Sequence, residues 1–356
     1  MALERYFVDF TERDWERESV SGTVRMAVVG VGGFARERAL PAIDASAYTD
    51  ATVLVSGSPD STREVADEFG VEHVIGYDAF LDGVLTDTYD AVYVATPNAF
   101  HGRYATAAAD YGKHVICEKP LETTPARARE VVDACAEAGV TLMTAYRLQC
   151  EPTVRRTREL VRDGVIGDVV QIHGGFSNPL LANTTPDTWR LDADLAGGGA
   201  LVDLGVYPLN TVRFVLDTDP VSVYASTTST DDAFAAVDQH VAFQLEFPGG
   251  ATASCTASFD AHANSQLQLI GTEGSVWIAS PFGGVVPHEI VVESGDMCME
   301  YTGRPTDEVR EEFAYFGYCV LTETTPEPDG HDGLTDAAII DAAYDAAGSD
   351  RRVELV

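Results

Sequence analysis

The segment from residue 24 to about residue 45 limits the possible folds of this chain more than any other feature. A β-rich run over residues 24–29 is followed by Gly30-x-Gly32-x-x-Ala35, and this turn opens a helical stretch. The first glycine of such a turn makes the tight bend, the second lets the backbone approach a pyrophosphate, and the small third residue lets the helix pack on the sheet. The motif alone is weak evidence, but between a strand and a helix it predicts a dinucleotide site. The predicted cofactor contacts in this turn are Gly30, Gly32, Gly33 and Phe34.

Short strands and helices alternate as far as residue 146. This order is typical of βαβ units, so it predicts an α/β domain with a doubly wound parallel sheet over residues 23–146. The expected strands are 24–29, 52–55, 91–95, 114–117 and 140–144, and the expected helices are 35–45, 61–69, 100–111 and 125–138.

The pattern changes after residue 146, where strand-like runs separated by glycine turns predominate. Turn signals at 248–250 and 272–274 predict hairpins. We therefore expect an α+β domain over residues 147–356, with an open-faced, mostly antiparallel sheet whose uncovered face meets a second subunit. Its expected strands are 169–176, 221–228, 240–247, 252–259, 266–270 and 275–278, and its expected helices are 152–163 and 336–347.

Residues 1–22 form a polar arm that carries several aromatic side chains. A disordered tail would also be polar, but the aromatic residues favour an arm that packs on a neighbouring subunit.

The end of the second strand discriminates between the two nicotinamide dinucleotides. An NAD site usually has an acidic residue there, which binds the adenosine ribose. This chain has Ser56-Gly57-Ser58-Pro59 at that point, with Arg63 one short turn later. Hydroxyls and a cation suit a 2′-phosphate, so Ser56, Ser58 and Arg63 favour NADP, with NAD as the weaker alternative. Asp60 argues the other way, and Arg63 is equally well explained as a solvated helix residue.

Three polar residues follow another expected strand. Thr96, Asn98 and His101 come directly after the strand at 91–95, at the carboxyl edge where doubly wound sheets bind ligands. We expect them to contact the cofactor, although a plain loop would have a similar composition.

Only two of the 23 basic residues are lysines, Lys113 and Lys119. An arginine stays protonated in a protein, whereas the pKa of a lysine falls readily when its amine is partly buried. Lys113 lies on a polar turn, where chance explains it. Lys119 follows an apolar run between Glu118 and Pro120, and we interpret it as a tunable amine used in chemistry.

The formal net charge of −34 excludes nucleic acid and anionic membranes as natural partners. An acidic, lysine-poor chain is expected to work in concentrated salt, which screens its self-repulsion.

The six cysteines show no C-x-x-C and the eight histidines no zinc spacing, so neither a disulfide framework nor a metal site is expected. The first 22 residues lack the apolar core of a secretory signal, so we expect a halophilic, cytoplasmic protein.

With Glu118-Lys119-Pro120 after the glycine turn, the chain resembles the glucose–fructose oxidoreductase / inositol dehydrogenase family. The resemblance extends over nearly the whole chain and includes Tyr146-Arg147, Trp189-Arg190-Leu191 and the run from Ala196 to Tyr207. It implies a Rossmann domain, an open-faced sheet domain, hydride transfer between a sugar carbon and a nicotinamide, and a homodimer or homotetramer built on the open sheet. The runs at 55–57 and 205–207 are most similar to the branch with glucose–fructose oxidoreductase and the archaeal D-xylose 1-dehydrogenases.

The resemblance also implies roles for individual residues. Lys119 becomes the catalytic lysine, Asp203 its partner beside the sugar, and Tyr207 the proton-transfer residue, where many relatives have histidine. Without the resemblance, Asp203 would be interpreted as a helix cap and Tyr207 as a core aromatic. Asp203 and Tyr207 are four residues apart and would share a helix face, although Pro208 must either kink that helix or start its regular part.

The remaining site residues are less specific. Glu118 is expected to hold the lysine amine near the cofactor, with a surface ion pair as the alternative. The resemblance implies a cis bond before Pro120, which would aim the lysine at the nicotinamide. Trp189 and Arg190 could line the sugar pocket or pack between domains. The glycine run at 197–199 is expected to sit close to a ligand.

These residues lead to one principal hypothesis, the NADP-dependent oxidation of an aldose at C1 to its lactone, with D-xylose as the preferred substrate in pentose catabolism. A second hypothesis is a glucose–fructose oxidoreductase with tightly bound NADP. A third, of another class, is a non-catalytic regulator that senses a dinucleotide.

Overall fold

The structure, a computed structural model, describes residues 3–355, which form two compact units. The parallel-sheet unit contains residues 14–147 and 309–337. The mixed-sheet unit contains residues 3–13, 148–308 and 338–355. The boundary between residues 147 and 148 lies one residue from the expected boundary. Residues 309–337, which were expected in the second domain, belong to the parallel-sheet unit. The N-terminal arm is divided between the two units after residue 13.

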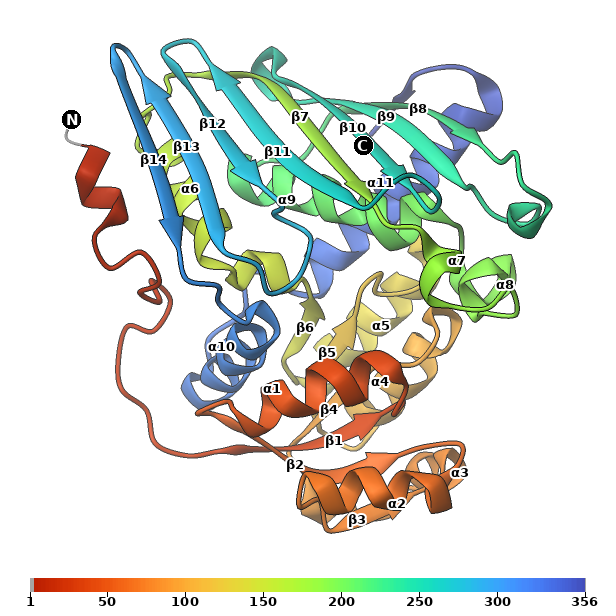
Figure 1. Cartoon of the computed structure of the whole chain (residues 1–356). Coiled ribbons are helices and arrows are strands. Elements are labelled where there is room, and N and C mark those ends of the chain that lie inside the picture. Colours follow the sequence, from red (N-terminus) through yellow and green to blue (C-terminus); the bar gives the residue numbers. More distant parts are fainter. Residues whose placement is uncertain (1–2, 356) are drawn as a thin grey trace. The chain divides into compact units, whose positions relative to one another are not determined.

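The parallel-sheet unit is built on six parallel strands in the order β3-β2-β1-β4-β5-β6 (Figure 1). This is the doubly wound order in which the chain reverses direction next to the first strand, and ligands bind at the carboxyl edge there. The predicted α/β class is therefore confirmed. The strands are β1 (Val24–Val29), β2 (Thr49–Val55), β3 (His73–Ile75), β4 (Ala91–Val94), β5 (His114–Glu118) and β6 (Leu142–Ala145), and the helices are α1 (Leu40–Asp44), α2 (Pro59–Glu68), α3 (Tyr77–Leu81), α4 (His101–Asp110), α5 (Pro125–Ala138), α10 (Glu308–Thr322) and the first part of α11 (Gly330–Ser349).

Local sequence explains why these elements form where they do. Helix α5 begins at Pro125, whose fixed φ suits a first helical turn, and the Thr124 hydroxyl before it accepts the Arg127 N–H at 3.3 Å. It ends at Gly139, which has the left-handed φ of +66°. Strand β4 has the continuous apolar sequence of a strand that is buried on both faces, and all four of its residues are buried.

The mixed-sheet unit has nine strands in the order β14-β13-β12-β11-β7-β10-β9-β8-β15 (Figure 1). Among the strands within residues 3–355 of this sheet, only the β7–β10 pair is parallel, so the expectation of a mostly antiparallel second sheet is confirmed. The elements are α6 (Pro152–Arg162), β7 (Val169–Ser177), α7 (Leu180–Asn183), α8 (Ala193–Ala196), α9 (Val206–Leu216), β8 (Ser222–Thr228), β9 (His240–Glu246), β10 (Thr252–Ser258), β11 (Asn264–Gly271), β12 (Gly274–Ala279), β13 (His288–Ser294), β14 (Met297–Gly303) and β15 (Val353–Glu354).

The two faces of this sheet differ in character. Helices α6 and α9 contact one face, where Ala253, Cys255 and Ala257 of β10 are buried. Between them, Ser254 and Thr256 point the other way and are exposed, as is Thr252 before them. The alternation of small apolar and small polar residues thus produces one covered face and one open face.

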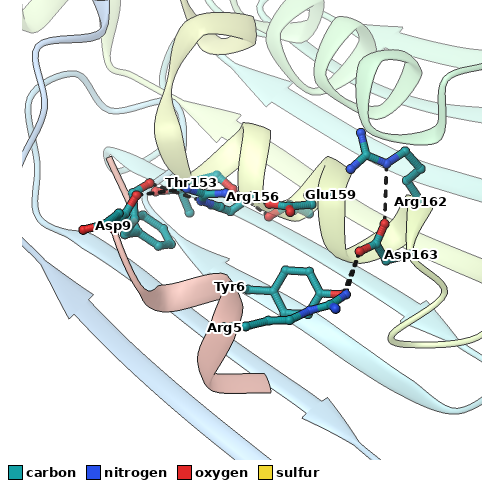
Figure 2. A network of polar contacts seen from close by, with 10 residues as sticks. Arg5, Tyr6, Asp9, Thr153, Arg156, Glu159, Arg162 and Asp163 are labelled. Carbon is teal, nitrogen blue, oxygen red and sulfur yellow. Dashed lines mark hydrogen bonds and ion pairs between the residues drawn. The ribbon is translucent and has the colours of Figure 1, made fainter. Parts of the chain in front are cut away.

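The first part of the N-terminal arm packs on its own chain. The Tyr6 hydroxyl donates to Asp163 Oδ2 at 2.9 Å, and the Arg5 guanidinium forms an ion pair with the same oxygen, also at 2.9 Å (Figure 2). Asp163 directly follows helix α6, and Arg156 of that helix donates to the Asp9 carbonyl at 2.9 Å. These contacts attach the arm to its own chain, while the expectation that it packs on a neighbouring subunit stays a prediction.

Aromatic rings complete the attachment of the arm. Phe10 is only 3% exposed and stacks on Tyr301 of β14 with 4.3 Å between ring centroids. In the parallel-sheet unit, Trp15 packs against Tyr315 and Tyr318 of α10 at 5.2 and 5.4 Å. The scattered aromatic residues of the arm are therefore anchors that bury apolar surface within the chain.

We expect Phe10→Ala to lower the free energy of unfolding by about 3 kcal/mol, because it removes a buried ring and leaves a cavity. The measurement is a urea titration in molar KCl, with Val8→Ala as the control, since Val8 is 63% exposed. An unchanged midpoint for Phe10→Ala would contradict the assigned packing.

None of the helices within residues 3–355 is long and apolar enough to cross a membrane.

Candidate active site

The glycine turn after β1 has the shape of a phosphate cradle. Gly30 has a φ of +98°, and a Cβ there would lie 2.6 Å from the Ala95 carbonyl oxygen, so only glycine fits this close approach to the end of β4. A Cβ on Gly32 or Gly33 would meet no atom within 4 Å, so the backbone of the turn faces open space. Phe34, the residue after these glycines, is 39% exposed. A π-helical turn (Ala35–Ala39) follows and leads into α1.

A buried hydroxyl group shortly after strand β4 is a second feature that fits a cofactor site. Thr96 is 7% exposed, and its Oγ1 has no hydrogen-bond partner among the described residues. A buried polar atom without a partner costs free energy, so such an atom indicates an absent ligand or water. The open turn follows β1 and Thr96 follows β4, and these two strands are paired in the sheet. The turn and the Thr96 hydroxyl together fit a dinucleotide.

The structure brings Ser56 and Ser58 together at the end of β2. The buried Ser56 hydroxyl accepts the Ser58 N–H at 3.1 Å. Ser58 is the N-cap residue of α2 but its side chain makes no capping hydrogen bond, and it is exposed. Arg63 and Asp60 are both exposed on α2, so the cation and the competing acid remain available on the same helix.

Strands β4 and β5 end side by side and carry the next group of predicted residues. Val94 of β4 is paired with Cys117 of β5, so the loops that begin at Ala95 and Lys119 are neighbours. The Lys119–Pro120 bond is cis, as predicted. Asn98 is 5% exposed, in a short 3-10 turn over Asn98–Phe100.

Glu118 accepts a strong hydrogen bond from a residue that the sequence did not single out. The Tyr93 hydroxyl donates to Glu118 Oε1 at 2.6 Å. Burial, followed by the charge of Glu118, raises the pKa of Tyr93 well above its usual range, so Tyr93 stays protonated and donates. One oxygen of the Glu118 carboxylate is therefore oriented from within the sheet.

His101 is completely buried, with one ring nitrogen 2.9 Å from the Pro120 carbonyl oxygen and the other 2.9 Å from the Thr96 carbonyl oxygen. Both nitrogens are thus engaged by backbone. The expectation that His101 contacts the cofactor is not supported, because its polar atoms face the protein.

In the mixed-sheet unit, Asp203 and Tyr207 lie on one helix face, as predicted. A π-helical segment (Leu201–Gly205) leads directly into α9. Within residues 201–210 only Asp203 and Tyr207 are partly exposed, while the others are buried. Pro208 lies in the first turn of α9, where a helix has no need of the missing N–H. A π-helical segment next to such residues is frequent at functional sites.

Arg190 and Trp189 lie beside Asp203 in the same unit. Arg190 Nε donates to Asp203 Oδ2 at 3.2 Å, and its guanidinium lies 4.5 Å from the centroid of the Trp189 ring. The side chains of Arg190 and Asp203 keep 35% and 24% exposure. The three predicted residues therefore form one contiguous group that combines a cation, an acid and an aromatic face.

Two aromatic residues that the sequence did not reveal hold the Tyr207 ring. Phe176 of β7 meets it edge-on at 5.4 Å, and Phe282 of the β12–β13 loop lies 6.3 Å from it. The fully buried Phe282 is fixed by its backbone N–H, which donates to Ser265 Oγ at 2.9 Å. No motif marks these residues, because they approach Tyr207 from distant strands.

The glycine run at 197–199 lets an acidic side chain approach the start of the following helix. The Asp238 carboxylate accepts the N–H groups of Gly199 and Leu201 at 2.7 and 2.8 Å and the Tyr344 hydroxyl at 2.6 Å. A Cβ on Gly198 would lie 2.1 Å from that hydroxyl. Asp238 thus caps the helix that carries Asp203 and Tyr207, and the expectation of a ligand beside the glycines stays a prediction.

Comparison with known proteins decides the family. The model of an oxidoreductase family with an NAD-binding Rossmann fold matches residues 24–146, and that of the GFO/IDH/MocA C-terminal domain matches residues 154–277. The chain belongs to the GFO/IDH/MocA oxidoreductase family. The resemblance inferred from Glu118-Lys119-Pro120 and the later motifs is therefore confirmed.

The relatives of this oxidoreductase include two archaeal enzymes. It is 43% identical to a D-xylose 1-dehydrogenase [NADP(+)] of Haloarcula marismortui over 97% of each chain. It is 36% identical to D-xylose 1-dehydrogenase (NADP(+)) 2 of Haloferax volcanii over 92% of this chain and 98% of the relative.

Two solved structures extend the comparison. The aldose–aldose oxidoreductase of Caulobacter crescentus, complexed with glycerol, is 32% identical with a TM-score of 0.88, over 94% of this chain and 100% of that one. A 3-ketoreductase of Actinomadura kijaniata, in complex with NADP and TDP-benzene, is 28% identical with a TM-score of 0.82, over 91% and 98%.

Proposed function

We propose that this oxidoreductase oxidises the C1 hydroxyl of a cyclic aldose, D-xylose before others, to the lactone with NADP. The observation that carries the proposal is the 43% identity to the Haloarcula marismortui D-xylose 1-dehydrogenase over 97% of both chains. The presence of Lys119, Asp203 and Tyr207 in one chain supports it, because these residues can move the proton that such an oxidation releases.

NADP is the cofactor that the residues after β2 favour. Ser56 and Ser58 present hydroxyls, the N-terminus of α2 adds N–H donors, and Arg63 supplies a cation on the same helix. The open turn at Gly32 and Gly33 would hold the pyrophosphate, and the Thr96 hydroxyl gives the loop after β4 a donor for the cofactor. When bound, NADP supplies the hydride acceptor.

Three residues then have defined tasks. Tyr207 accepts the proton of the sugar C1 hydroxyl as the C1–H bond breaks. Tyr207 must be a phenolate to accept that proton, and it becomes a neutral phenol. The ammonium group of Lys119 stabilises the sugar oxygen that loses the proton and becomes a carbonyl. Asp203, together with Arg190, binds sugar hydroxyls, while the Trp189 ring offers a face to the sugar C–H groups.

The proposal is tested by initial rates of nicotinamide reduction in molar KCl with a panel of aldoses and inositol, with NADP and NAD supplied separately. We expect D-xylose with NADP to give the highest kcat/KM. Turnover of inositol above every aldose, or no turnover of any sugar by the folded protein, would contradict it.

A second candidate is an oxidoreductase that keeps its NADP bound and passes hydride between two sugars. The structural likeness to the aldose–aldose oxidoreductase of Caulobacter crescentus favours it. Nicotinamide released on denaturing the purified, dialysed protein would support this candidate, whereas a protein free of nucleotide would support the dehydrogenase. A non-catalytic sensor is disfavoured, since sensing needs no proton relay.

We also propose a setting for the enzyme. The charge of −34 and the relatives from halophilic archaea support work in a salt-rich cytoplasm, in pentose catabolism. The small polar side chains on the open face of the mixed sheet, such as Thr252 and Ser254, support a homodimer or homotetramer built on that face.

A further inference from the structure

We propose that His101 is a positioning residue: its imidazole ring connects the loop after β4 to the loop after β5 and thereby fixes the place of Lys119. This inference rests on the proposed function, because it assigns His101 a role through the catalytic lysine. His101 is distinct from the residues that contact cofactor or sugar.

The geometry places His101 between two loops at the cofactor edge of the parallel sheet. It is the first residue of α4, and one ring nitrogen lies 2.9 Å from the carbonyl oxygen of Thr96, at the start of the loop that leads into this helix. The other nitrogen lies 2.9 Å from the carbonyl oxygen of Pro120, the residue after Lys119. A single rigid ring thus spans the backbones that follow β4 and β5.

The protonation state of the ring does not remove this connection. A neutral imidazole has one N–H and donates to one of the two carbonyls, while an imidazolium donates to both. Burial lowers the pKa of His101, although the two carbonyls and the charges of Glu118 and Glu122 oppose the shift. In every state the ring fills the space between the two oxygens, so it sets the separation of the loops.

Both connected loops carry residues assigned to the reaction. The loop after β4 contains Thr96, whose Oγ1 lacks a partner among residues 3–355, and the buried Asn98. The loop after β5 begins at Lys119 itself. A further attachment exists, because Arg127 donates to the Ala99 carbonyl at 2.7 Å, so loss of His101 should displace the loops and leave them partly held.

The chain provides a matched control in His114, which begins β5 and so lies at the opposite end of that strand from Lys119. It is partly buried, and its Nδ1 accepts the Thr141 N–H at 3.1 Å. His101→Phe and His114→Phe both remove hydrogen bonding by the ring, but only the first touches the loops of the site.

The experiment is a double-mutant cycle of His101→Phe and Lys119→Met in molar KCl, with kcat, the KM for D-xylose and the melting temperature measured for each variant. We expect His101→Phe to lower kcat about 10-fold to 100-fold while KM changes less than about 3-fold, because the lysine is misplaced and the sugar residues are not. In the Lys119→Met background we expect less than about a 2-fold further loss, since both changes remove the same contribution. His101→Gln, which keeps an N–H donor, should recover part of kcat.

Three results would overturn the inference. The first is an equal loss of kcat in His101→Phe and His114→Phe, which would indicate general destabilisation. The second is a double variant in which the losses of kcat from His101→Phe and Lys119→Met multiply in full. The third is a His101→Gln variant as slow as His101→Phe although it melts at the temperature of the wild type.

Failure of the proposed function gives a different pattern. If Lys119→Met alone keeps full turnover, the catalytic assignment of the lysine fails. The role of His101 is then tested by the Kd of NADPH, which is measured from the fluorescence of the bound cofactor. We then expect His101→Phe to raise the Kd several-fold while His114→Phe does not, because the loop with Thr96 and Asn98 moves. An unchanged Kd in both variants would also reject the role of His101.

Discussion

Lys119→Met is expected to lower kcat for D-xylose by about 10³-fold, because it removes the positive charge that stabilises negative charge developing at the sugar oxygen. Methionine keeps much of the length and apolar character of the lysine stem, so the local packing is largely retained. The measurement is steady-state turnover in molar KCl at high enzyme concentration, together with a melting curve that shows the variant is folded.

The second lysine of the chain is the matched control. Lys113 comes just before β5 and Lys119 just after it, so the two amines flank opposite ends of one strand. The Lys113 amine lies 5.5 Å from the centroid of the Tyr89 ring, a contact outside the proposed site. Lys113→Met should keep kcat within about 2-fold, and a fall equal to that of Lys119→Met would mean that loss of positive charge anywhere on this acidic protein is what slows the enzyme.

Tyr207→Phe is expected to lower kcat by roughly 10²-fold to 10³-fold, because it removes the proton acceptor while the ring remains. Phenylalanine can keep the edge-on contact with Phe176 and the contact with Phe282, so the melting temperature should stay close to that of the wild type. Stopped-flow and steady-state rates, measured with saturating NADP, separate this chemical loss from weaker binding.

Tyr224→Phe serves as the control for the loss of a hydroxyl. Tyr224 lies on β8 of the same unit, and its hydroxyl donates to Asp350 at 2.7 Å on the surface. We expect this variant to turn over at the wild-type rate. If Tyr207→Phe were equally active, the proton would have to leave the sugar by another route and the assignment of Tyr207 would be wrong.

The sequence was sufficient to predict elements whose signals are local. Strand β1 and helix α5 were predicted to the residue, since the first is a β-rich run closed by Gly30 and the second is bounded by Pro125 and Gly139. The shared face of Asp203 and Tyr207 followed from helical spacing alone, and the cis bond at Pro120 followed from the family resemblance.

Elements without such signals were missed. Strand β14 (Met297–Gly303) lies at the edge of its sheet, and each of its residues is partly or fully exposed, so it shows little of the apolar alternation that marks a half-buried strand. Strand β3 and helix α3 are too short to show a period. The placement of residues 309–337 with the parallel sheet depends on contacts with residues far away in the chain, which no local pattern reveals.

The site shows the same division. The residues with a motif around them, such as Gly30 and Lys119, were predicted, whereas those that orient them were not. Tyr93 reaches Glu118 across paired strands, and Asp238 caps the helix of Tyr207 from a distant loop. His101 was predicted at the correct edge of the sheet, but only its two carbonyl partners show that it faces the protein. Orientation depends on tertiary structure, and residue type gives only the location.

The fate of the hydrogen at C1 of the sugar tests the proposed oxidation most directly. The enzyme is incubated in molar KCl with NADP and D-xylose deuterated at C1, and the reduced cofactor is analysed by mass spectrometry. We expect NADPH that is heavier by one deuterium, together with xylonolactone and a slower reaction than with unlabelled xylose. Unlabelled NADPH would show that the hydride comes from another carbon and would contradict oxidation at C1.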